Sequence, residues 1–159
     1  MIDLLWRGLV IGIGATILMD IWALILAYFP GQSRPNWRPV GRWVGHLGNG
    51  RVFHNDIATA APFALENSMG WAFHYIVGAL YGAILVALTG PGWLVHPTFW
   101  PAWIWGIVTI AGGWFLLQPG LGIGWAASRT PNPNRVRIMG LIAHTVFGFG
   151  LYATALLIR

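Results

Sequence analysis

The chain has 159 residues, of which 57% are hydrophobic and only 8% are charged. A soluble domain usually carries about 25% charged residues, so this chain has too few charges to cover a water-facing surface. Its formal charge of +5 comes from scattered arginines without a basic run, and it has no cysteine. The composition therefore excludes disulfides, thiolate metal sites and cysteine catalysis, argues against nucleic acid as a partner, and predicts an all-α integral membrane protein.

Four stretches are long and apolar enough to span a bilayer, which takes about 20 helical residues for about 30 Å of hydrocarbon. They run from about 4 to 29, 70 to 88, 99 to 118 and 138 to 158. The first stretch is too long for an ordinary signal peptide, so we expect it to be retained. Pro119 either ends the third span or kinks it. The pattern predicts an antiparallel bundle of four transmembrane helices, forming a single membrane domain over residues 1–159.

The loop between the first two spans, residues 30–69, is the only sizeable extramembrane segment. Within it, apolar residues recur at helical spacing near residues 39–47, after Pro39. This spacing suits a short helix lying in the membrane interface. An irregular loop with a few anchoring aromatic residues is the alternative.

The arginines give the expected orientation, because cytoplasmic loops of bacterial inner-membrane proteins are enriched in positive charge. The loop over residues 90–98 contains no arginine, whereas the first and third loops contain most of them. We therefore expect the first and third loops to be cytoplasmic and both termini to be periplasmic. The residues that carry this prediction are Arg34, Arg38, Arg42, Arg51, Arg129, Arg135 and Arg137.

Small residues recur about every four positions in each span, so they share one face of each helix. In lipid, helices associate where small residues let their backbones approach closely. The glycines predicted to pack helices together are Gly8, Gly12, Gly78, Gly82, Gly106, Gly113, Gly140 and Gly148.

Polar residues within the spans are the most informative feature of the sequence. A carboxylate well inside a span costs about 3 kcal/mol on insertion scales, so it usually has a partner or a function. The predicted topology gathers a polar cluster on the cytoplasmic side, comprising Asp20, His74, Gln118 and His144. The loops on the same side add the candidate contributors His46, His54, Asp56 and Glu66.

Several chemistries fit this cluster. His74, His144 and Asp20 could hold a transition metal, although the histidine spacings match no compact metal signature. Alternatively, His74 and His144 could bind a b-type haem, since each has a glycine four residues away on its own face. A proton or substrate path in a homo-oligomer is a third possibility, and a satisfied polar network that fixes helix register is the fourth. The sequence contains no hydrolase or nucleotide-binding motif, which argues against an enzyme.

Four motifs resemble a known family of small bacterial inner-membrane proteins. These motifs are GRWVGHLGNGRVFHNDI, GWAFHYIVG, QPGLGIGWAASRTPNP and HTVFGFGLY. They are similar to the family catalogued as domain of unknown function DUF2938, and the likeness covers nearly the whole chain. The resemblance implies a multi-pass bacterial membrane protein and brings no activity, substrate or cofactor. The remaining hypotheses are a ligand-binding membrane protein, a small oligomeric transporter, and an accessory subunit of a membrane complex.

Overall fold

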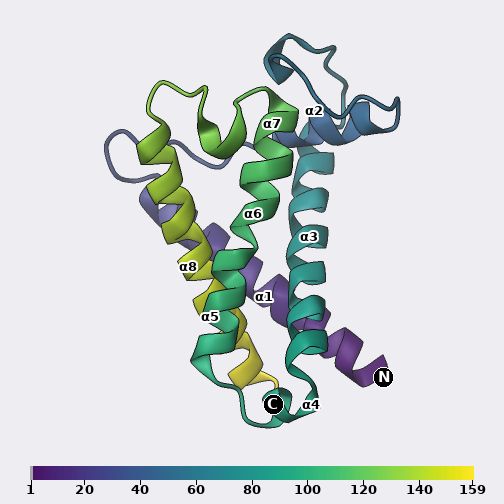
Figure 1. Ribbon diagram of the computed structural model, residues 1–159, viewed down its shortest axis with the longest axis vertical. Helices are drawn as coiled ribbons and strands as arrows, with labels where there is room; N and C mark the ends of the chain where they lie inside the picture. Colours follow the sequence, from purple (N-terminus) through teal and green to yellow (C-terminus); the bar gives the residue numbers. More distant parts are fainter. Residues whose placement is uncertain (1) are drawn as a thin grey trace. The chain divides into compact units, whose positions relative to one another are not determined.

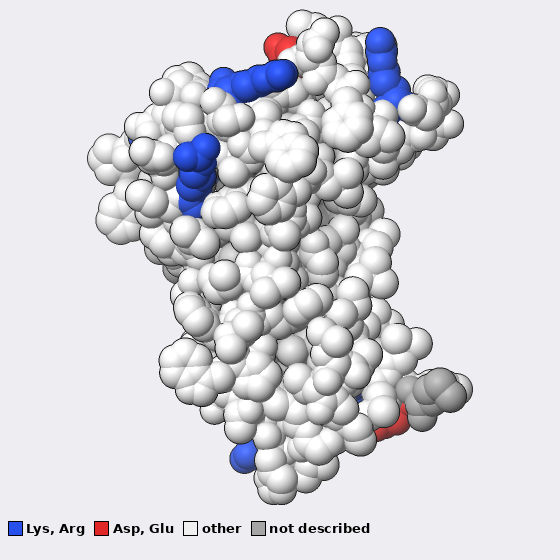
Figure 2. All heavy atoms as spheres, in the orientation of Figure 1, with Lys and Arg blue, Asp and Glu red and all other residues white. Residues whose placement is uncertain are grey.

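The computed structural model describes residues 2–159, and within them every regular element is helical (Figure 1). Four helical segments are long and apolar enough to cross a membrane. They are α1 (Ile2–Leu26), α3 (Glu66–Thr89), the segment Phe99–Leu121, and α8 (Pro133–Leu157). The predictions of an all-α chain and of four apolar spans are therefore confirmed. The surface agrees with these apolar spans, since few charged side chains appear on the face that Figure 2 shows.

The helix boundaries differ most from the predicted spans at α8, which begins at Pro133 instead of about residue 138. Arg135 and Arg137, which we expected in the third loop and at the membrane edge, therefore lie in the first turns of this helix. At the other end of the chain, α1 ends at Leu26, before the turn that precedes Pro30. Polar residues can extend a helix beyond its apolar stretch, and hydropathy does not mark such an extension.

Pro119 does not end the third segment. This segment comprises α5 (Phe99–Val108), α6 (Ile110–Gly112), the π-helical turn η2 (Gly113–Leu117) and α7 (Gln118–Leu121). Proline cannot donate the usual backbone hydrogen bond, and a wider π turn just before it accommodates this defect. The helix stops at Gly122, which adopts the left-handed conformation with φ 89°. Its N–H and that of Ile123 close a Schellman motif, donating to Pro119 O at 3.0 Å and Gln118 O at 3.1 Å.

Four short helices complete the secondary structure: α2 (Arg38–Leu47), η1 (Ile57–Thr59), α4 (Pro91–Val95) and η3 (Trp125–Ala127). The chain divides into two compact units. Unit 1 contains the residues up to Pro35, Tyr75–Thr109 and Leu141–Arg159, and unit 2 contains Asn36–His74 and Ile110–Gly140.

Close helix contacts in unit 1 depend on glycine. A Cβ on Gly12 of α1 would collide with the Gly78 carbonyl oxygen in α3. A Cβ on Gly106 of α5 would lie 2.6 Å from Gly148 Cα in α8. These contacts permit a core that includes Ile11, Ala15, Leu85, Val86, Leu94, Phe147 and Leu151.

Two of the predicted packing glycines, Gly113 and Gly140, lie in unit 2 and differ from the others. A Cβ on Gly113 would meet no atom within 4 Å, so no close helix contact depends on its small size. A Cβ on Gly140 would make only an ordinary contact, 3.4 Å from Ile110 Cδ1. Spacing along a helix identifies the face that a glycine occupies, but it does not identify a neighbour on that face.

In unit 2, α2 lies against the start of α3, where Gly41 and Gly70 leave room for the backbones to meet. The apolar side of α2 is buried within the unit, since Trp43 forms a core cluster with Ile57 and Leu121. The helix occupies the position expected from the spacing after Pro39. Its location in a membrane interface stays a prediction.

Candidate functional site

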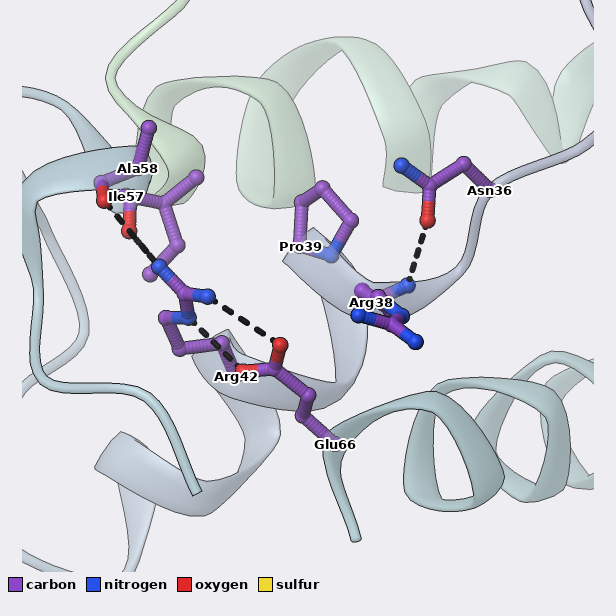
Figure 3. Close-up of a pocket in the computed structure, with 7 residues that line it drawn as sticks. All are labelled: Asn36, Arg38, Pro39, Arg42, Ile57, Ala58 and Glu66. Carbon is purple, nitrogen blue, oxygen red and sulfur yellow. Dashed lines mark hydrogen bonds and ion pairs between the residues drawn. The ribbon is translucent and has the colours of Figure 1, made fainter. Parts of the chain in front are cut away.

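An ion pair joins α2 to α3 in unit 2. Arg42 donates from Nε to Glu66 Oε2 at 2.8 Å and from Nη2 to Glu66 Oε1 at 3.1 Å. The two side chains are only 16% and 10% exposed. The remaining terminal nitrogen of Arg42 donates to the carbonyl oxygens of Ile57 and Ala58 at 3.2 Å and 3.1 Å (Figure 3). It also donates to the carbonyl oxygen of Ala60 at 3.2 Å.

These hydrogen bonds give Arg42 a structural role. Its hydrogen bond to Glu66 raises the pKa of the guanidinium above its ordinary value, so it stays charged. A bidentate guanidinium–carboxylate pair also fixes orientation, because both groups are planar. Arg42 therefore fastens the segment around η1 to α2 and α3, and it has little donor capacity left for a ligand.

A pocket of about 270 Å³ lies beside this pair. Arg38 also lines it, and within residues 2–159 the guanidinium of Arg38 makes no hydrogen bond. The pocket thus combines two guanidinium groups with one carboxylate, which leaves it net positive. Its lining residues are Asn36, Arg38, Pro39, Arg42, Ile57, Ala58 and Glu66 (Figure 3). Of these, sequence reasoning had treated Glu66 as a candidate and the arginines as topology signals, and it had missed Asn36.

Two of the predicted loop histidines meet in unit 2. The His46 and His54 rings are in edge-to-face contact, with centroids 5.1 Å apart. His46 Nε2 lies 3.1 Å from Ala61 O, and His54 Nδ1 lies 3.0 Å from Gly120 O in α7. His54 Nε2 is buried without a hydrogen-bond partner.

The polar residues of α1 and α8 have partners inside unit 1. Asp20, which is 9% exposed, accepts a hydrogen bond of 2.8 Å from the Tyr75 hydroxyl. His144 Nδ1 lies 3.0 Å from both Thr109 Oγ1 and Gly106 O. These contacts agree with a satisfied polar network. Tyr75 was missed because a tyrosine in an apolar span carries no distinctive signal.

The other members of the predicted cluster lie in unit 2. His74 stacks on Trp37 with ring centroids 3.9 Å apart, and Gln118 Oε1 is buried without a hydrogen-bond partner. Asp56 caps η1 by accepting from Ala58 N at 2.9 Å. Within residues 2–159, no group of three or more His, Asp or Glu side chains is arranged to hold a metal ion.

The fold and the site define an all-helical protein with four potential membrane spans and a polar, pocket-bearing unit. The chain belongs to the family described as Protein of unknown function (DUF2938), whose model matches residues 9–158. This match confirms the resemblance inferred from the four motifs. No curated protein and no solved structure matches the chain.

Proposed function

We propose that this chain is a multi-pass protein of the bacterial inner membrane, with its four long helices in an antiparallel bundle and both termini in the periplasm. The four apolar segments and the unequal distribution of arginines among the loops support this proposal. Reporter fusions test it: those at Asn49 and Asn132 should report cytoplasm, and one at Gly92 should report periplasm. The inverse pattern would refute the orientation.

The function that we propose is binding of a phosphate-bearing anionic group in the pocket beside α2. The observation that carries this proposal is the guanidinium of Arg38, which lines a net positive pocket and, within residues 2–159, makes no hydrogen bond. Guanidinium groups bind phosphate oxygens through charge-assisted, often bidentate hydrogen bonds. The proposed cytoplasmic location supplies such groups, because basic pockets on that side of membrane proteins bind the headgroups of anionic lipids.

The ordinary alternative is that Arg38 only marks topology and remains solvated. A charge-matched pair of variants separates the two explanations. Arg38→Gln removes a charge from the pocket, whereas Arg51→Gln removes one from an exposed position of the same loop that does not line it.

Binding of phosphatidylglycerol and of inorganic phosphate to the detergent-purified chain provides the measurement. Loss of one charge-assisted hydrogen bond, worth about 1.5 kcal/mol, should weaken binding roughly tenfold in Arg38→Gln and leave Arg51→Gln near wild type. Lipid binding alone would identify a headgroup site, and binding of both would identify a general phosphate site. Equal affinities in the two variants would remove the pocket from consideration.

A further inference from the structure

The turn after α2 brings together two histidines that lie eight positions apart in the sequence. Gly50 N donates to Leu47 O at 2.9 Å, and Arg51 N donates to His46 O at 3.1 Å. Gly50 has φ 73°, a conformation that glycine adopts without strain. The chain therefore reverses direction, and the Trp43 indole holds the returning segment through a 2.8 Å hydrogen bond to Val52 O.

The hydrogen bonds of the two rings fix which nitrogens carry protons. A carbonyl oxygen can only accept, so the nitrogen that faces it must be the donor. His46 therefore donates from Nε2 to Ala61 O, and His54 donates from Nδ1 to Gly120 O. In the neutral rings, His46 Nδ1 and His54 Nε2 then carry lone pairs. The latter is buried and has no partner.

We infer that His46 and His54 form a binding site for a divalent transition-metal ion that favours imidazole, such as Zn²⁺. Metal-binding histidines commonly donate their other N–H to a backbone carbonyl, as both rings do here. Two imidazoles bound at 2.0–2.1 Å to one tetrahedral ion would place their ring centres about 5 Å apart. The observed separation of 5.1 Å fits this arrangement.

The site supplies two protein nitrogens, so water would occupy the remaining coordination positions. This inference is independent of the anion pocket, since neither histidine lines it. A purely structural role for His54, anchoring its loop to α7, accounts for Nδ1 and leaves the buried lone pair on Nε2 unexplained.

Zinc titration of the full chain, purified in detergent and stripped of metal, tests the site. The titration uses a competing chromophoric chelator in phosphate-free buffer, with Mg²⁺ as the hard-cation control. We expect one Zn²⁺ per chain and no Mg²⁺ binding.

Three single variants locate the site. His46→Gln and His54→Asn should each weaken Zn²⁺ binding at least tenfold, whereas His96→Asn, at an exposed histidine of unit 1, should not. The asparagine amide at residue 54 can still donate a hydrogen bond to Gly120 O. If His54→Asn unfolds, His46→Gln still tests the site. The His46 hydrogen bond to Ala61 O is exposed, so its loss should leave the fold intact. Absence of stoichiometric Zn²⁺, or equal affinity in His46→Gln and wild type, would overturn the inference.

Discussion

Trp43 offers the most direct test of how unit 2 is held together. Its side chain is 3% exposed, and its indole N–H donates to Val52 O at 2.8 Å. Phenylalanine in its place would keep an aromatic ring and lose this donor. The lost hydrogen bond should cost about 1 kcal/mol. The lost volume, roughly 35–40 Å³, adds about 0.9 kcal/mol at about 24 cal/mol per Å³. We therefore expect Trp43→Phe to destabilise the protein by about 2 kcal/mol.

The matched control is the same substitution at Trp125, whose side chain is 66% exposed. Exposed substitutions usually change stability by less than about 0.5 kcal/mol. Unfolding in an SDS titration, followed by the helical circular dichroism signal, measures both variants. Each variant lacks one indole fluorophore, so the helical signal is a better readout than tryptophan fluorescence. Equal stability of the two variants would show that neither the burial nor the hydrogen bond of Trp43 stabilises unit 2.

Two pairs of glycine substitutions test packing and backbone conformation in the same assay. Gly12→Ala should destabilise unit 1 by about 1–3 kcal/mol, because the added methyl group overpacks the contact between α1 and α3. Gly92→Ala is the control and should not destabilise it, since a Cβ there has no atom within 4 Å. Similar effects of the two substitutions would contradict the close contact between α1 and α3. Gly122→Ala and Gly50→Ala both force alanine into a left-handed conformation, costing about 1–2 kcal/mol. Of these two positions, only residue 122 has a neighbour that the added Cβ would strike, the Asn55 carbonyl oxygen. Gly122→Ala should therefore lower the stability more than Gly50→Ala. The reverse order would refute this contact.

The spans could be predicted because their signal is local. Each apolar stretch is long enough to identify a helix without reference to its neighbours, and all four appear as expected. The ends were harder, because polar residues such as Arg135 continue α8 beyond the apolar stretch. Pro119 left two alternatives in the sequence, and the choice depended on a π turn that no composition signal marks.

The contacts of the candidate site residues were less predictable, because their partners come from distant parts of the chain. Glu66 meets Arg42 across 24 positions, and His54 meets Gly120 across 66. The sequence predicted that His46 and His54 belong to one loop, while their ring contact required the turn at Gly50. Residue type therefore identified candidates. Only the tertiary contacts distinguished Arg42, whose side chain is hydrogen-bonded, from Arg38, whose guanidinium makes no hydrogen bond within residues 2–159.

The buried polar groups of the two units differ in a way that favours unit 2 as the binding region. In unit 1, Asp20 and His144 have partners, at 2.8 Å and 3.0 Å. Among the described residues, the buried side-chain atoms without a hydrogen-bond partner are Trp37 Nε1, His54 Nε2 and Gln118 Oε1, and all three belong to unit 2. Leaving such a group unsatisfied costs about 1–3 kcal/mol. A ligand or ion that satisfied one of these atoms would recover that free energy, whereas the paired groups of unit 1 offer no comparable gain. The histidine pair contains one of these atoms, His54 Nε2, whereas the arginine pocket belongs to the same unit and is lined by none of them.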